Sequence, residues 1–126
     1  MSYEKKSKEL TLIPKYEFYM EYMLEVILLH LPRTEKFSIG TDFKQVMYST
    51  LEDIMYISKL PKSQRLMYLN RIDAKLNTQR ILLRIMKKFV WIDIKKFNTA
   101  MGQIYETGKI LGGLIKYYAK NNTKSI

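Results

Sequence analysis

Residues 69–90 read LNRIDAKLNTQRILLRIMKKFV, and their apolar pattern determines the architecture we expect. The positions that would face a core recur at alternating intervals of three and four, with one glutamine among them: Leu69, Ile72, Leu76, Gln79, Leu83, Met86 and Val90. This spacing is typical of a helix packed nearly parallel to its neighbours. Because Ser63 can cap a helix that follows Pro61, the pattern predicts one helix of roughly 27 residues that reaches about Phe89.

Two amphipathic helices are expected upstream of this stretch. Residues 14–31 would form the first, because Pro14 suits an initial turn in which its missing N–H needs no partner, and the next proline stops the helix. Residues 32–40 then form a connector, and Thr41 or Asp42 can cap the second helix by accepting a hydrogen bond from a free backbone N–H. The apolar positions of the two helices are Tyr16, Met20, Met23, Leu24, Ile27, Leu28 and Leu31, and then Phe43, Val46, Met47, Leu51, Ile54 and Ile57.

A fourth helix is expected to begin near Asp93. Its seam positions repeat the intervals of four and three: Phe97, Met101, Ile104, Gly108, Leu111, Ile115 and Tyr118. Four helices of similar length joined by short connectors most economically form an all-α, antiparallel up-down four-helix bundle. A chain of 126 residues can stabilise one such core. We therefore expect a single domain over residues 1–126, with residues 1–12 and 121–126 frayed.

The composition excludes several classes of site. The chain has no cysteine and one histidine, His30, which rules out a disulfide, a thiolate zinc site and an imidazole metal cluster. Residues 1–8 are polar and charged and are not followed by an apolar stretch with a small-residue cleavage site, so no secretory signal is expected. The longest apolar runs are far too short to span a bilayer. We therefore expect a soluble, cytoplasmic protein without a membrane partner.

The sequence contains no recognisable catalytic constellation. It has no glycine loop after a strand that could bind phosphate. It also has no Ser/His/Asp set that its one histidine could serve. Glu17, Glu21 and Glu25 lie along one helix face, but a ferritin-like metal site also needs Glu-x-x-His pairs, which are absent. A solvated face is the favoured interpretation of these glutamates, with pairing to a basic neighbour across the bundle as the alternative. His30 suits a structural or capping role. We expect no enzyme, no cofactor, no metal and no small-molecule substrate.

Charge is divided unequally along the chain. Residues 1–60 contain eight Lys/Arg and nine Asp/Glu, whereas residues 61–126 contain fourteen and three, so that −1 and +11 add to the formal net charge of +10. A soluble surface would ordinarily mix both signs. This one-sided field therefore implies a polyanionic partner such as RNA, DNA or an anionic membrane.

The basic residues of the third helix fall on two flanks of its apolar seam. One flank holds Arg65, Arg80, Arg84, Lys87 and Lys88. Arg71 and Lys75 fall on the other flank. A row of arginines on a rigid helix can grip phosphates without reading bases, and Lys109 and Lys116 of the fourth helix would support it. The alternative is that these residues form only a solvated charged face.

Aromatic and glycine residues of the fourth helix suggest further contacts. Tyr117 and Tyr118 stand between Lys116 and Lys120, where an aromatic face beside cations could stack on bases, whereas most other tyrosines suit a core or an interface. The three glycines of this helix, Gly108, Gly112 and Gly113, each cost about 1 kcal/mol relative to alanine. Close approach of another helix backbone would offset that cost. A phosphate-binding glycine loop is the alternative, which the unbroken apolar seam disfavours.

A second apolar stripe on the third helix exceeds what one core requires. It comprises Ile81, Leu82, Ile85 and Phe89, and Trp91 follows it. A helix that is apolar on more than one side is buried on more than one side. We interpret Ile81, Ile85, Phe89 and Trp91 as a subunit interface. The alternative is that these residues pack under the connector to the fourth helix.

Three segments resemble the accessory variability determinant proteins of diversity-generating retroelements. They are Leu31-Pro-Arg, Ile72-Asp-Ala-Lys-Leu with Leu82-Leu-Arg-Ile, and the glycine-bearing Glu106-Thr-Gly-Lys-Ile-Leu-Gly-Gly-Leu-Ile, which is the most specific. The chain also resembles, more distantly, the four-helix-bundle proteins encoded in ribosomal-RNA intervening sequences. Those proteins usually carry an Asn-Ile-Ala-Glu-Gly-like stretch in the second helix. Here that region reads Leu51-Glu-Asp-Ile-Met, which favours the retroelement branch.

The resemblance implies a homopentameric barrel of four-helix bundles with a basic surface and no catalytic residue. It also implies a partnership with the element's reverse transcriptase and association with its template RNA during mutagenic retrohoming. The first hypothesis is thus an oligomeric accessory subunit that binds RNA or DNA. The alternative is a helical scaffold, or an intervening-sequence-type bundle protein, that docks an acidic protein partner.

Overall fold

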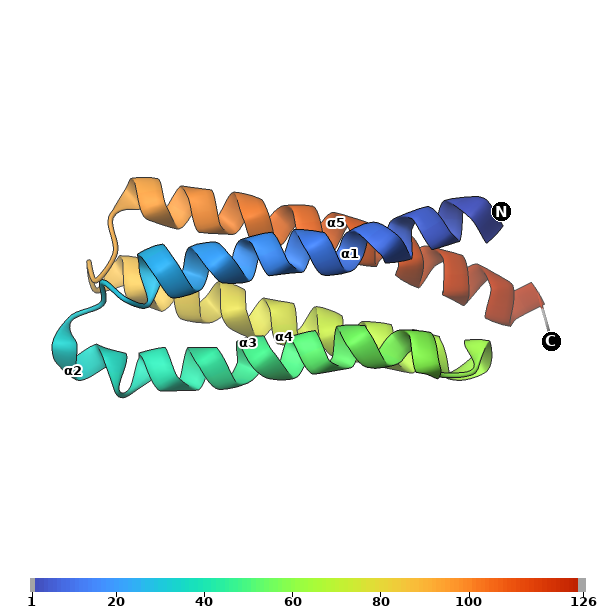
Figure 1. Ribbon diagram of the computed structural model, residues 1–126, viewed down its shortest axis with the longest axis horizontal. Coiled ribbons are helices and arrows are strands. Elements are labelled where there is room, and N and C mark those ends of the chain that lie inside the picture. The colour runs from blue at the N-terminus through green and yellow to red at the C-terminus, as the bar shows by residue number, and fades with distance from the viewer. Residues whose placement is uncertain (1, 125–126) are drawn as a thin grey trace.

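The computed structural model describes the backbone of residues 2–124 and the side chains of residues 11–121. Four long helices run antiparallel to one another in this part of the chain (Figure 1). They are α1 (Ser2–Tyr22), α3 (Ile39–Tyr56), α4 (Lys62–Lys88) and α5 (Ile94–Lys124), and the short α2 (Arg33–Lys36) lies in the first connector. The predicted all-α class with four antiparallel helices is confirmed, whereas homo-oligomeric assembly stays a prediction.

Helix α1 begins at Ser2, so the predicted start near Pro14 is wrong. Pro14 lies inside the helix and is exposed, while Leu12 and Tyr16 on either side of it are buried. A proline inside a helix removes one backbone hydrogen bond, and burial of these two neighbours offsets the loss. The predicted fraying of both chain ends stays a prediction, because the side chains of residues 1–10 and 122–126 lie outside the described part.

The helical segment that follows α1 is wound more widely than an α-helix. Met23–Ile27 form a π-helical turn, in which the Leu28 N–H donates to the Met23 carbonyl at 2.8 Å. The predicted apolar positions of the first expected helix are buried except Leu24, which is half-buried. The wider turn therefore keeps the apolar residues before the connector inside the core.

The other helix starts differ slightly from the expected caps. Helix α3 starts at Ile39, before Thr41 and Asp42, and α4 starts at Lys62 with the backbone of Pro61 in the cap position, so Ser63 is no cap. Helix α5 begins next to Asp93, as predicted, and Asp93 caps it, because the Lys96 N–H donates to Asp93 Oδ1 at 2.8 Å. Pro32 and Pro61 thus predicted the positions of two connectors, whereas the exact capping residues depend on local backbone geometry.

Val90 is the predicted seam residue of α4 that lies outside the core. Its side chain is 81% exposed, and its φ of 59° places it in the left-handed region that valine rarely adopts. The turn is closed by hydrogen bonds from the Val90 N–H to the Lys87 carbonyl and from the Trp91 N–H to the Met86 carbonyl, both at 2.9 Å. The periodic pattern therefore ends at Met86, and Val90 belongs to the turn.

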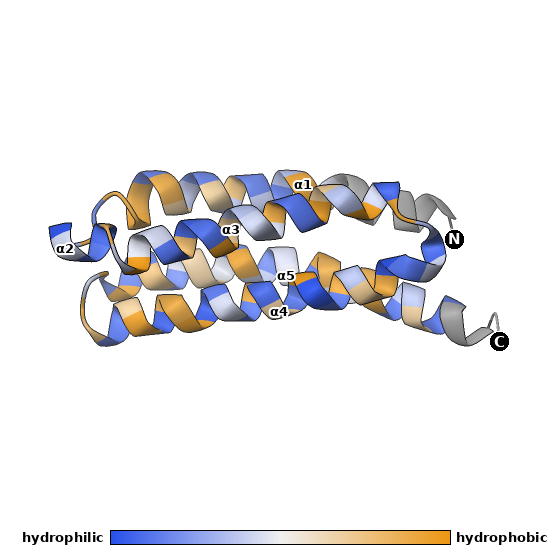
Figure 2. Cartoon of the chain, turned by 90° about the horizontal axis from the view of Figure 1, so that it is seen from below, coloured by the Kyte–Doolittle hydropathy of each residue, from blue (hydrophilic) through white to orange (hydrophobic). Residues whose placement is uncertain are grey.

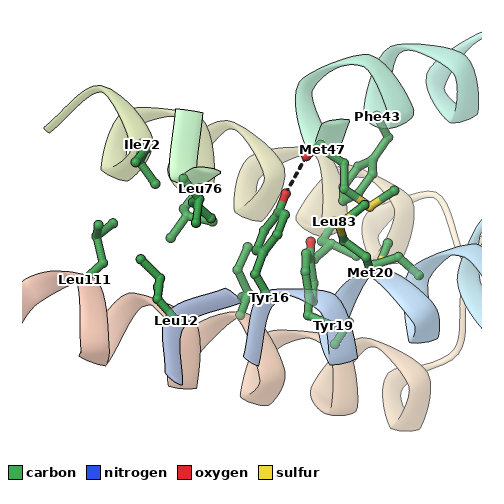
Figure 3. Close-up of a cluster of buried hydrophobic side chains, with 14 of the residues drawn as sticks. Leu12, Tyr16, Tyr19, Met20, Phe43, Met47, Ile72, Leu76, Leu83 and Leu111 are labelled. Atoms are coloured by element: carbon green, nitrogen blue, oxygen red, sulfur yellow. Dashed lines mark hydrogen bonds between the residues drawn. The ribbon is translucent and has the colours of Figure 1, made fainter. Parts of the chain in front are cut away.

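Buried polar side chains join three of the helices. Gln79 of α4 donates to the Tyr16 hydroxyl at 2.9 Å and to Thr50 at 3.0 Å, and it accepts a bond from Tyr19 at 2.8 Å. Tyr16 in turn donates to the Met47 carbonyl of α3 at 2.7 Å (Figure 3). Burial raises the pKa of Tyr16 to about 12 and that of Tyr19 well above its usual value. These bonds satisfy the buried groups and fix the relative register of α1, α3 and α4.

The extent of packing differs among the pairs of long helices. Helix α1 packs more extensively on α5 than on α3, while α4 packs on both α3 and α5. A groove of about 390 Å³ opens between α1 and α3, lined by Ile13, Glu17, Met20, Glu21, Leu24, Leu51 and Met55. Hydrophilic and hydrophobic residues alternate along every long helix (Figure 2). Over the described residues, none of the helices carries an apolar stretch of the length needed to cross a bilayer.

Candidate nucleic-acid interface

One flank of α4 faces α3, and there its cations meet an acid. Lys75 Nζ donates to Asp53 Oδ2 and to Ser49 Oγ, each at 2.6 Å. Arg71 Nε lies 3.3 Å from the same Asp53 oxygen. The side chains of Lys75 and Asp53 are 19% and 12% exposed. These ion pairs belong to the packing between α3 and α4, and they compensate one of the two positive charges, while the Arg71 side chain stays 57% exposed.

The opposite flank of α4 faces α5, and there its cations meet aromatic rings and a glycine. The Lys87 ammonium lies 4.8 Å from the centroid of the Phe97 ring. Arg80 lies over Gly108, where an added Cβ would come within 2.5 Å of the guanidinium, and it also donates to Asn77 Oδ1 at 2.6 Å. These contacts position both cations without neutralising them, because neither an aromatic ring nor an amide carries a compensating charge.

Arg65 occupies one end of this flank and is half-buried. Its Nε donates to the Leu60 carbonyl at 3.0 Å, and its Nη1 donates to the Tyr118 hydroxyl at 2.8 Å. The guanidinium therefore links the start of α4 to the end of α5. Several of its donors are engaged within the chain, so a phosphate-binding role for Arg65 would share this structural one.

The remaining predicted phosphate contacts lie on the solvent side of α4 and α5. Arg84, Lys88 and Lys116 are exposed and have no carboxylate within 4.0 Å among the described residues. Lys109 lies 3.8 Å from Glu106, and its side chain is 62% exposed. An exposed pair of this kind contributes little energy and is screened by salt. We call Arg65, Arg80, Arg84, Lys87, Lys88, Lys109 and Lys116 together the basic face.

Of the two tyrosines that the sequence suggested for base stacking, Tyr118 is buried and Tyr117 is half-buried. Tyr118 is 1% exposed and packs edge-on against Tyr117, with 5.2 Å between the ring centroids. Tyr105, which the sequence analysis did not select, is 60% exposed on α5. The Lys109 ammonium lies 5.9 Å from its ring centroid.

Gly108 and Gly112 of α5 are not approached closely by the backbone of another helix, contrary to the expectation from the sequence. At Gly108 the nearest group is the side chain of Arg80, and at Gly112 an added Cβ would meet nothing within 4 Å. The expectation of close backbone approach is therefore wrong for these two positions within one chain. Within the bundle, Gly108 instead makes room for the side chain of Arg80, whereas no contact offsets the cost of Gly112.

The second apolar stripe of α4 lies outside the core. Ile81 and Phe89 are 48% and 59% exposed, and Ile85 is half-buried. Phe89 stacks on the half-buried Trp91 with 5.2 Å between the ring centroids, so this end of the stripe packs in part on the turn before α5. The alternative of packing under the connector therefore applies to Phe89 and Trp91, and the subunit-interface role of all four residues stays a prediction.

The acidic residues of α1 and of the π-helical turn that follows it lie away from the basic face. Glu17, Glu21 and Glu25 are exposed, and they form no ion pair with a described residue. Within residues 11–121, no three His, Asp or Glu side chains are grouped so that they could hold a metal ion. His30 Nδ1 lies 2.9 Å from the Val26 carbonyl, which fits the expected capping role at the end of the first expected helix.

Comparison with known proteins identifies one family. The model of the family described as bAvd-like matches residues 10–118, which include most of α1, the whole of α3 and α4, and α5 as far as Tyr118. No curated protein sequence matches the chain. The matched span contains the whole basic face and the whole apolar stripe.

Proposed function

Because the chain belongs to the bAvd-like family of accessory proteins of diversity-generating retroelements, we propose that it is a non-catalytic, nucleic-acid-binding subunit of the element's reverse transcriptase. In this role it handles template RNA or its cDNA copy during mutagenic retrohoming. The family consists of accessory proteins rather than enzymes. Chemistry is therefore assigned to the reverse transcriptase, and binding to this chain.

The observation that carries the proposal is the difference in partners between the two flanks of α4. Cations on the α3 side are paired with Asp53, whereas Arg84, Lys88 and Lys116 on the basic face have no carboxylate partner in the described part of the chain. A surface of exposed arginines and lysines on two rigid helices neutralises phosphates and releases their counterions. Such binding depends strongly on salt and weakly on base sequence.

Self-association strengthens this binding. Ile81 and Phe89 are exposed, and Ile85 and Trp91 are half-buried. Together they form an apolar surface beside the basic face, which suits a contact with a sister subunit or with the enzyme. In the homopentamer that the family resemblance implies, each subunit would present one basic face. Several faces on one particle bind a long polyanion more tightly than one face does, because later contacts become intramolecular.

The experiment is a titration of the protein with mixed-sequence RNA and DNA at two salt concentrations. The expected affinity falls steeply as salt rises, by about a thousandfold for six phosphate contacts between low and physiological salt. The second candidate, a helical scaffold that docks an acidic protein surface, predicts no binding even at low salt. That result would contradict the proposal and favour the scaffold.

A further inference from the structure

We propose that the ring of Tyr105 is a stacking platform for an unpaired base, so that the basic face binds single-stranded nucleic acid in preference to a duplex. This inference rests on the proposed function and specifies the ligand of the same site. Neither RNA nor DNA is favoured, because every base has a flat face that can stack.

The ring of Tyr105 is open to solvent. Its side chain is 60% exposed, and its one ring contact among the described residues is with the Lys109 ammonium. Tyr56, by contrast, is 45% exposed and packs its ring on Tyr68 with 5.4 Å between centroids. Large aromatic rings left open beside cations are the arrangement by which proteins hold single strands.

The register between α4 and α5 places this ring inside the basic face. Arg80 of α4 lies directly over Gly108 of α5. Tyr105 precedes Gly108 by about one turn, and Arg84 follows Arg80 by about one turn. Because the two helices are antiparallel, these steps run in the same direction, and Arg84 lies across from Tyr105. The ring thus has a cation on its own helix, Lys109, and another on the neighbouring helix.

The surroundings of the ring leave room for a base. Gly102 lies one turn before Tyr105, and an added Cβ there would meet nothing within 4 Å; the same holds at Gly112, two turns after it. No bulky side chain at these positions stands beside the ring on the outer side of α5. A base stacked on Tyr105 would therefore keep its phosphates within reach of Lys109 and Arg84, whereas duplex bases are already stacked and offer phosphates alone.

The test compares four ligands with equal numbers of phosphates: oligothymidylate, oligouridylate, an abasic oligodeoxynucleotide and a mixed-sequence duplex. Tyr105→Ala is expected to weaken binding of both base-bearing single strands about tenfold, since one base stack is lost. Its affinity for the abasic strand and the duplex should stay within about twofold of the original protein's. Tyr105→Phe keeps the ring and should bind every ligand as the original protein does.

Tyr48→Ala on α3 is the matched control, because Tyr48 is 42% exposed and lies on a different helix. It should change none of the four affinities. An equal loss for duplex and single strands in Tyr105→Ala, or no loss for either, would overturn the stacking inference while leaving salt-dependent binding intact. Absence of binding to every ligand at low salt, in the unchanged protein, would instead overturn the proposed function itself and point to an acidic protein partner.

Discussion

The two flanks of α4 carry cations of the same kind but use them differently. On the α3 side, Lys75 and Arg71 converge on Asp53, which is itself largely buried. On the α5 side, Arg80 and Lys87 lie against a glycine and an aromatic ring, which position a cation without neutralising it. The comparison teaches that the number of cations on a helix does not predict its ligand. The partner that each cation meets across the bundle decides whether the charge is structural or available.

The largest expected effect comes from removing Asp53, the acid on α3 that pairs with the cations of one flank. Asp53→Ala leaves Lys75, whose side chain is 19% exposed, without its carboxylate partner. We expect a loss of about 3 kcal/mol in the free energy of unfolding, because an uncompensated charge remains partly buried. Urea denaturation measures it, with Glu52→Ala at the exposed neighbouring position as the control. A loss no greater than that of the control would show that the two flanks do not differ in this way.

A pH titration tests the buried polar cluster on the α3 side of α4, where Gln79 donates hydrogen bonds to Tyr16 and Thr50. The pKa of Tyr16 is raised from 10.0 to about 12 by burial, so the folded protein keeps the phenolic proton at a pH where the unfolded chain releases it. The stability that this group contributes is present below pH 10 and is lost as the pH rises toward 12, by about 2 kcal/mol.

The measurement is the free energy of unfolding across that pH interval for Tyr16→Phe and for Tyr48→Phe as the control. Tyr16→Phe is expected to be less stable at neutral pH, since it loses its bond to the Met47 carbonyl, but to fall less steeply above pH 10. Identical slopes in Tyr16→Phe and in the unchanged protein would contradict this account of the polar cluster.

The smallest expected effect tests whether the surface of α5 at Gly112 is free of contacts with other groups. An added Cβ at Gly112 meets nothing within 4 Å, so Gly112→Ala should raise the free energy of unfolding by about 1 kcal/mol through helix propensity alone. Gly108→Ala is the companion variant and should gain less, because Arg80 must move. Thermal unfolding and light scattering measure both. Destabilisation or a change of subunit number in Gly112→Ala would mean that another subunit packs on this glycine.

The sequence predicted the core of α4 well, because helical periodicity reports which side of a helix is buried, but it predicted that of α5 only in part, since Ala100, Thr107 and Leu114 are also buried there. Leu69, Ile72, Leu83 and Met86 are fully buried as their spacing required. The same periodicity failed at Val90, since a left-handed turn there is set by the hydrogen bonds that close the helix and not by apolar spacing. The start of α1 was missed because an exposed proline can be carried inside a long helix whose other side is buried.

The candidate site was harder to predict, because it depends on contacts between helices. The angular positions of Lys75 and Arg84 placed them on opposite flanks, but spacing alone could not show that Asp53 of another helix meets one of them. Tyr105 was missed for a related reason. Its exposure follows from the register of α5 against α4, which no local pattern encodes, whereas Tyr118 looked suitable beside lysines and is buried.

The central claim is that the basic face, and not net charge in general, holds the polyanion. The direct test measures the salt dependence of oligonucleotide affinity for Arg84→Glu/Lys88→Glu and for Lys44→Glu/Lys59→Glu, two pairs of exposed residues with the same change in charge. Circular dichroism establishes that both variants remain folded. We predict that the first pair weakens binding about thirtyfold and lowers the slope of log affinity against log salt by about two, while the second changes affinity less than about threefold. Equal losses in both pairs, or no loss in the first, would contradict the claim.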